Sequence, residues 1–176
     1  SSNVQKALDG IQMGLLIKIP LLFDGSRLGF TENSFLQYDI EPEDIGSGCY
    51  FLAWPTGHDY IVGFIGGQFA WNLSKQGQNE IVEYALSKLD ALSGRNIRKH
   101  FLKGFATDWA NNPLTEGSYS AVKPGCYGVR KLLSEPIAEK LMFAGEATTG
   151  NKAGLVNGAY ESCLLYTSDA ADDAGS

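Results

Sequence analysis

The chain has 176 residues, 44% of them hydrophobic, with 14 basic and 20 acidic side chains and a net charge of −6. That content suffices for a globular core and excludes the disordered class, and without a stripe of Lys and Arg nothing supports nucleic-acid binding. No apolar run reaches transmembrane length. The three widely spaced cysteines predict neither a metal cluster nor a disulfide framework. Composition does not fix the compartment, and we expect the cytoplasm.

The first predicted elements are strands. Residues 15–23 form an apolar run that only Lys18 and Pro20 interrupt. Residues 50–54 and 60–65 form two more runs, separated by Pro, Gly and Asp, which are turn residues. This pair predicts a hairpin.

A helix is predicted over residues 80–92, because its apolar positions recur at helical spacing and Gly94 lies where a C-terminal cap would. Residues 97–106 then predict another strand. Strands, a helix and a further strand indicate an α+β arrangement.

The C-terminal part of the chain combines a strand, a glycine-rich loop and a helix start. Residues 141–143 are a short apolar run typical of a buried strand, Gly145 permits a sharp turn, and a helix can begin near Gly154. The first N–H groups of a helix have no intrahelical partner and carry partial positive charge. Such an end suits a phosphate or the electron-rich edge of a reduced flavin.

Three blocks of sequence resemble one family. The first is Phe-Ala-Gly-Glu-Ala-Thr at 143–148 with Gly-Leu-Val-Asn-Gly-Ala-Tyr-Glu-Ser at 154–162. The second runs from Trp109 through Asn-Pro to Gly-Ser-Tyr-Ser at 117–120, and the third and weakest is the lysine-bearing strand at 13–23. In their order along the chain, the three blocks resemble the flavin-dependent amine oxidases, which include monoamine oxidases, polyamine oxidases, L-amino-acid oxidases and the flavin-type histone lysine demethylases.

The resemblance implies two catalytic residues. Lys18 matches the family's strand lysine, which holds a water at the flavin N5 and assists the reaction of reduced flavin with oxygen. The alternative for a lysine in an apolar strand is an edge strand from which it reaches solvent. Tyr119 would form one wall of the substrate channel, where an aromatic ring supplies flat apolar surface.

The resemblance also implies contacts with non-covalent FAD. Trp109 would supply apolar surface, and Ser118 stands where monoamine oxidases carry the cysteine that is bonded to the flavin. A serine cannot form that thioether. Glu146, beside Gly145, would lie along the ribityl and phosphate portion, and its alternative role is to cap local backbone N–H groups.

At the expected helix start, Gly154, Leu155 and Val156 complete the cofactor-binding set. The resemblance implies that the N–H groups of Leu155 and Val156 face the pyrimidine edge of the flavin. Leu155 replaces a second tyrosine of the monoamine oxidases, which argues against small aromatic monoamines and leaves polyamine-like or other amines open.

We expect an incomplete chain. It contains no strand, G-x-G-x-x-G and helix unit for a pyrophosphate. We therefore interpret residues 1–107 as part of the substrate-binding domain, a mixed sheet with helices, and residues 108–162 as the C-terminal return into a Rossmann-like FAD-binding domain. Residues 163–176 resemble a translated sequencing adapter and are expected to be non-native; the alternative is a genuine helix end with an acidic tail.

The activity that the resemblance implies is oxidation of an amine to an imine by hydride transfer to FAD, with O2 as acceptor and without a metal. The partners would be a small-molecule amine and oxygen, not nucleic acid or a membrane. Two alternatives stay open: a flavoprotein like the carotenoid desaturases or protoporphyrinogen oxidases, and a catalytically silent interaction protein that keeps the fold.

Overall fold

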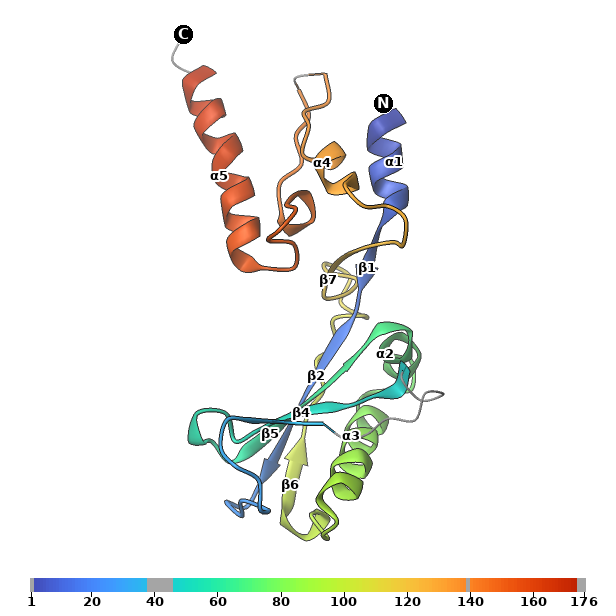
Figure 1. Cartoon of the computed structure of the whole chain (residues 1–176), viewed down its shortest axis with the longest axis vertical. Coiled ribbons are helices and arrows are strands. Elements are labelled where there is room, and N and C mark those ends of the chain that lie inside the picture. Colours follow the sequence, from blue (N-terminus) through green and yellow to red (C-terminus); the bar gives the residue numbers. More distant parts are fainter. Residues whose placement is uncertain (1, 38–45, 139, 174–176) are drawn as a thin grey trace. The chain divides into compact units, whose positions relative to one another are not determined.

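The computed structural model describes residues 2–37, 46–138 and 140–173, with side chains from residue 3 to residue 164 in those ranges. The chain forms two compact units (Figure 1). Residues 15–118 form the central unit, and residues 1–14 with 119–176 form the terminal unit. Within the described residues, no helix is both long and apolar enough to cross a bilayer.

The central unit is built on a five-stranded antiparallel sheet with strand order β3-β4-β5-β2-β6. The strands are β2 (Leu16–Phe23), β3 (Ser34–Leu36), β4 (Tyr50–Ala53), β5 (Tyr60–Gly66) and β6 (Phe101–Gly104). Side chains alternate between the two faces of a strand. Ile17, Ile19 and Leu21 of β2 are therefore buried on one face, whereas Lys18 is exposed on the other.

Two helices, α2 (Gly67–Ser74) and α3 (Gln78–Ser93), contribute to the core on the buried face of this sheet. Figure 1 shows α3 running along the sheet. The helix buries Ile81, Ala85 and Leu89, which recur at helical spacing. It ends at Gly94, whose φ of 60° is left-handed and whose N–H donates to the Asp90 carbonyl (3.2 Å).

The terminal unit joins both ends of the chain through a two-stranded antiparallel ladder, β1 (Ile11–Gly14) with β7 (Tyr119–Val122). Its other elements are α1 (Ser2–Gly10), α4 (Val129–Leu133), a 3-10 turn η4 (Glu146–Thr148) and α5 (Val156–Asp173). A small core of Ala7, Val129 and Leu133 packs α1 against α4.

The hairpin and the long helix predicted from the sequence are confirmed as β4 with β5 and as α3. The strand expected over residues 97–106 is shorter, since a 3-10 turn η3 (Arg98–His100) precedes β6. The buried strand expected at residues 141–143 is wrong: Leu141 is 52% and Met142 41% exposed. A strand is buried only where neighbours flank it, and among the described residues this one forms a single bridge, to Ile137.

The units divide between Gly14 and Leu15 and between Ser118 and Tyr119. The sequence interpretation placed the change at 107/108 and left residues 1–14 in the first part. The difference arises because the pairing of β1 with β7 brings the N-terminal residues to the C-terminal part of the chain. The functional identities given to these parts, and the non-native tail, stay predictions.

Candidate functional site

The carboxylate of Glu146 ties together two segments of the terminal unit. Its Oε1 accepts the backbone N–H of Ser120 (2.7 Å), and its Oε2 accepts the Ser120 hydroxyl (2.9 Å) and the backbone N–H of Gly154 (2.6 Å). Bonds of this kind, to a charged acceptor, are short and strong. Glu146 therefore holds β7 at Ser120, the residue after Tyr119, and holds the loop just before α5 at Gly154. The structure shows the local capping role that was the alternative for this residue; its contact with FAD stays a prediction.

Arg130 of α4 completes this network from the other side. Its guanidinium donates to the Ser120 hydroxyl, to the Ser120 carbonyl (3.0 Å) and to the Ala147 carbonyl (3.1 Å), and it lies 3.9 Å from Glu146. The side chain is only 11% exposed. A fork of planar donors suits such a bridge, and a lysine could not reproduce it. Both backbone polar groups of Ser120 are thus held by side chains.

The turn at Gly145 has the conformation that the sequence analysis expected. Its φ of 137° lies in a region that L side chains rarely adopt. Ser162, a buried residue of α5, accepts the Gly145 N–H (2.7 Å), and the Thr148 hydroxyl donates to the Gly145 carbonyl (2.9 Å). The turn is therefore clamped between η4 and the helix.

Helix α5 begins two residues later than the expected Gly154. The Leu155 N–H donates to the Lys152 carbonyl (3.2 Å), whereas the N–H groups of Val156 and Asn157 have no acceptor among the described residues. A Cβ on Gly158 would clash with the Lys152 carbonyl, because the loop packs directly on the helix. Leu155 and Val156 are exposed, 51% and 88%.

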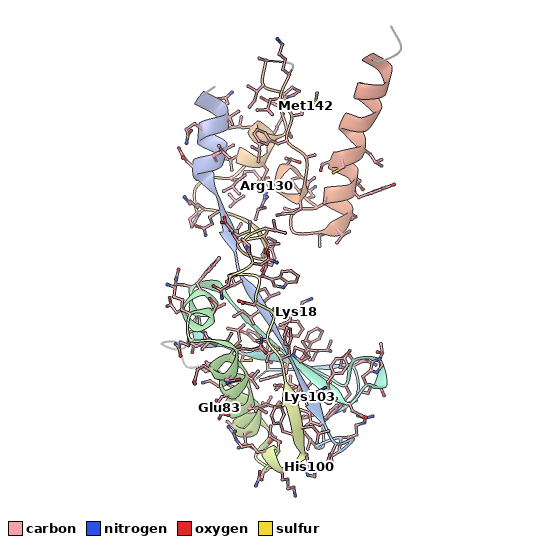
Figure 2. The ribbon with its side chains drawn as sticks, turned by 180° about the vertical axis from the view of Figure 1, so that it is seen from behind. Lys18, Glu83, His100, Lys103, Arg130 and Met142 are labelled. Atoms are coloured by element: carbon pink, nitrogen blue, oxygen red, sulfur yellow. The ribbon has the colours of Figure 1, made fainter. Side chains whose placement is uncertain are left out.

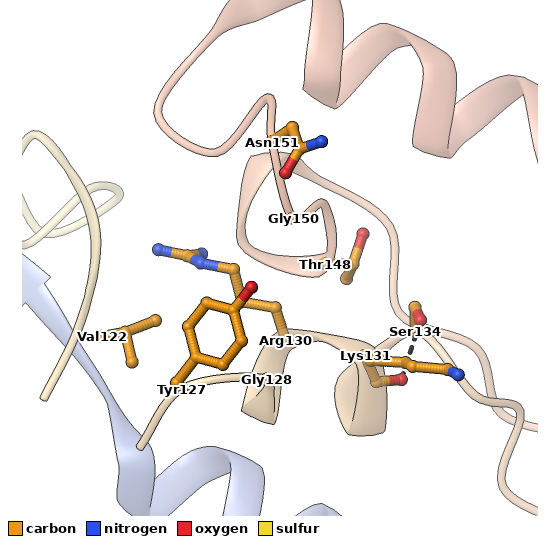
Figure 3. Close-up of a pocket in the computed structure, with 9 residues that line it drawn as sticks. All are labelled: Val122, Tyr127, Gly128, Arg130, Lys131, Ser134, Thr148, Gly150 and Asn151. Carbon is orange, nitrogen blue, oxygen red and sulfur yellow. Dashed lines mark hydrogen bonds between the residues drawn. The ribbon is translucent and has the colours of Figure 1, made fainter. Parts of the chain in front are cut away.

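A hollow of about 580 Å³ adjoins this network (Figure 3). It is bounded by α4 and by the loop after η4, with lining residues Val122, Tyr127, Gly128, Arg130, Lys131, Ser134, Thr148, Gly150 and Asn151. Arg130 uses three of its five N–H donors on Ser120 and Ala147, and Lys131 adds a second cation to this lining.

Lys18 stands in the interior of the sheet of the central unit, not at its edge. On one side it pairs with Phe64 of β5; on the other its backbone bonds Thr107, through N–H to hydroxyl (3.0 Å) and carbonyl to N–H (3.0 Å). Register places Lys18, Phe64 and Tyr50 in one row across the open face. Phe35 adds an aromatic ring 6.5 Å from that of Phe64. The edge-strand alternative is therefore wrong, although the side chain does reach solvent (Figure 2).

Trp109 and Ser118 lie in the last segment of the central unit, which ends at Ser118. The Ser118 hydroxyl donates to the Leu16 carbonyl and accepts the Leu16 N–H, both at 3.0 Å, so it is used on the β2 backbone. The Trp109 carbonyl accepts the Gly117 N–H (2.9 Å) and the Thr115 hydroxyl (3.1 Å), and the residue is 43% exposed.

A family model described as flavin containing amine oxidoreductase matches residues 1–165. The chain belongs to this family. The match covers both units and all three sequence blocks on which the resemblance rested, so FAD is the cofactor that the family implies.

Comparison with individual curated proteins gives relatives whose names fit this family. The chain is 30% identical over 169 residues to lysine-specific histone demethylase 1 homolog 2 of Arabidopsis thaliana, covering 93% of this chain and 23% of that protein. It is 29% identical over 166 residues to polyamine oxidase 5 of Oryza sativa subsp. japonica, with 93% and 32% covered, and 28% identical over 171 residues to polyamine oxidase 2 of A. thaliana, with 94% and 33% covered. The chain thus spans a third or less of these three relatives.

The predicted site residues of this family member divide between the units. Lys18, Trp109 and Ser118 belong to the central unit; Tyr119, Gly145, Glu146, Gly154, Leu155 and Val156 belong to the terminal unit. Within the latter, Glu146 bonds Gly154, and the Tyr119 ring lies about 3.9 Å from where a Cβ of Gly154 would be. The described residues hold no group of three potential metal ligands.

Sequence reasoning missed Arg130, Ser120 and the clamping role of Ser162. Ser120 lies in the Gly-Ser-Tyr-Ser block and Ser162 ends the helix block, so their positions carried a signal. Arg130 carried none, because a single arginine in a short helix is ordinary in sequence. Only the fold brings it to Ser120 and Ala147.

Proposed function

We propose that this chain is part of an FAD-dependent oxidoreductase that converts an amine to an imine, with oxygen as the electron acceptor. Family membership supports an oxidoreductase with this cofactor. When bound, FAD supplies the hydride acceptor and passes the electrons to oxygen; the protein supplies position and electrostatics.

The observation that carries the proposal is the setting of Lys18. Its backbone is bonded on both sides within the sheet, and its side chain stands on an open face beside Phe64 and Tyr50. Among the described residues no carboxylate forms an ion pair with it. A cation on an apolar face, without a counter-ion, keeps its donors for a water or for developing negative charge.

The residues of the terminal unit fit one edge of the cofactor. The open N–H of Val156 and the start of α5 present positive potential, and Tyr119 with Leu155 offers exposed apolar surface beside it. Glu146 has three of its acceptor sites in use, which leaves it room for one further donor such as a ribityl hydroxyl. Ser118 provides no thiol for a covalent link, so we propose that FAD binds non-covalently, with residues 108–162 as the C-terminal part of its Rossmann-like domain.

For the substrate we propose an aliphatic amine, either a polyamine or an alkylated lysine side chain. Leu155 is an aliphatic and exposed residue at the helix start, where a tyrosine would favour an aromatic amine. Relatives whose names include both polyamine oxidase and lysine-specific histone demethylase support the same class.

The test is Lys18→Met in the full-length natural protein, with Lys103→Met as the matched control. Lys103 of β6 lies opposite Leu22 of β2, so both lysines are exposed on the same face of the sheet (Figure 2). We expect Lys18→Met to slow amine oxidation or flavin reoxidation by about 10²-fold or more, as the loss of a positioned proton donor does, with FAD still bound. Lys103→Met should leave both rates unchanged. Equal rates for both variants would show that Lys18 is a surface lysine.

A further inference from the structure

A second hollow, of about 380 Å³, lies in the central unit and is formed by two loops that the amine chemistry does not use. One loop follows β2 and the other precedes β6. Its lining residues are Ser26, Leu28, Gly29, Arg95, Asn96, Lys99 and His100. Three of the seven lining residues are basic or can become so, in a chain whose net charge is −6.

His100 is held in a fixed orientation. Its Nδ1 lies 2.9 Å from the carboxylate of Asp24 and 3.0 Å from the hydroxyl of Ser26. Asp24 also accepts the Ser26 N–H (3.0 Å), and its own N–H donates to the His100 carbonyl (3.0 Å). The two loops are therefore locked together.

This trio is not a nucleophilic triad. In such a triad the serine bonds Nε2 and the carboxylate bonds Nδ1, so that the ring can carry the serine proton away. Here both partners share Nδ1. The arrangement fixes the imidazole ring. Because the Asp24 carboxylate can only accept, Nδ1 directs its N–H at Asp24, and the Ser26 hydroxyl proton stays available to donate to a ligand.

Arg95 is placed by a close approach to the opposite loop. A Cβ added to Gly29 would lie 2.8 Å from Nη1 of Arg95, so the guanidinium lies directly against that backbone. The preceding Leu28 has a φ of 55°, which is an outlier for a bulky side chain. Backbone strain of this kind tends to occur at functional sites.

Some of the basic side chains near the hollow form ion pairs and others do not. Arg27 pairs with Asp59 (2.8 Å) and Arg98 pairs with Glu83 (2.6 Å). Neither Arg95 nor Lys99 has a carboxylate within ion-pair distance in the part of the chain that the structure describes. Asp24, the nearby acid, is engaged by His100 and does not line the hollow.

We propose that this hollow binds a phosphate monoester. The phosphate would lie between Arg95 and Lys99, with the Ser26 hydroxyl and the Asn96 amide as further donors. A phosphate carries close to two negative charges and three acceptor oxygens, which match a planar fork, an ammonium and a hydroxyl better than the two oxygens of a carboxylate do. The rest of the hollow takes a small organic group against Leu28. This site is independent of the proposed amine oxidation.

The test is an amide NMR titration of the chain with inorganic phosphate and with glycerol 3-phosphate, at an ionic strength held constant with sodium chloride. We expect saturable shifts in residues 26–29 and 95–100, tighter binding of glycerol 3-phosphate, and weaker binding of succinate. Arg95→Gln should weaken binding by about tenfold and Lys99→Gln by about fivefold, as expected for charge-assisted bonds at a partly exposed site. Lys75→Gln, at an exposed lysine after α2 in the same unit, is the control and should have no effect.

Three results would overturn the proposal. Shifts that do not saturate, or that chloride alone reproduces, would mean general screening. Wild-type affinity in the Arg95→Gln and Lys99→Gln variants would place the ligand elsewhere. Succinate binding as tightly as glycerol 3-phosphate would show that the hollow does not select phosphate.

Discussion

Glu146→Gln is expected to loosen the terminal unit without affecting the central one. The carboxylate accepts three hydrogen bonds at 2.6 to 2.9 Å, two from Ser120 and one from the Gly154 N–H. A glutamine that keeps its oxygen on the Ser120 N–H turns its amide nitrogen toward the Gly154 N–H, so a donor meets a donor. The Ser120 hydroxyl can still bond, because it can accept.

The magnitude follows from the hydrogen bond to the Gly154 N–H, and the loss of the ion pair with Arg130 (3.9 Å) acts in the same direction. Hydrogen bonds to charged groups contribute about 1.5–3 kcal/mol, and Gly154 is exposed to water, so we expect a loss of about 1–2 kcal/mol. The amides of Ser120 and Gly154 should then exchange about 5- to 30-fold faster. Glu161→Gln is the matched control: this exposed carboxylate of α5 pairs with Lys152, and a surface pair contributes about 0–1 kcal/mol.

Hydrogen exchange measured by mass spectrometry separates the two units, and fluorescence adds a second readout. All three tryptophans lie within residues 15–118, so their emission reports unfolding of the central unit alone. We expect faster exchange in peptides covering 119–123 and 150–156 and an unchanged fluorescence transition. Unchanged exchange in those peptides would refute the clamp, and faster exchange throughout the chain would show that the effect is not local.

Further outcomes follow from the structure. A Cβ at Gly104 would lie 2.6 Å from the Val82 side chain, so Gly104→Ala should lower the free energy of unfolding by about 1–3 kcal/mol, measured by fluorescence in a urea titration. The control is Gly46→Ala, which should leave the free energy of unfolding unchanged because a Cβ there would meet open space. The hydrogen bond from His100 lowers the pKa of Asp24 from 3.8 to about 2, so the charged carboxylate stabilises the fold above the unfolded pKa and this stabilisation is lost as the pH falls toward 2. The loss of unfolding free energy caused by Asp24→Asn should therefore shrink as the pH falls toward 2, and a loss that stays constant with pH would contradict this role of Asp24. Burial raises the pKa of the Cys49 thiol to about 12, so iodoacetamide at neutral pH should spare it in the folded chain.

Local pattern made part of the fold predictable. The β4–β5 hairpin and α3 carry their signals within a few residues of each other: turn residues between two apolar runs, and an apolar helical period that ends at a glycine. The Gly145 turn was predictable for the same reason, since only a glycine adopts its φ readily.

What could not be predicted depends on partners distant in sequence. Whether Lys18 lies on an edge or a central strand is decided by Thr107, 89 residues away. Arg130 acquires its role only when α4 packs near Ser120 and Ala147. Residues 141–143 are apolar like a buried strand, yet their burial needs flanking strands that the described residues do not supply.

The most direct test of the amine-oxidation proposal is anaerobic addition of amines to the full-length natural protein while the absorbance of oxidised flavin is followed. We predict that the purified protein contains FAD, that a polyamine or a peptide with methylated lysine bleaches it, and that oxygen restores the absorbance. Flavin that stays oxidised with every aliphatic amine, or a purified protein that binds no flavin, would contradict the account.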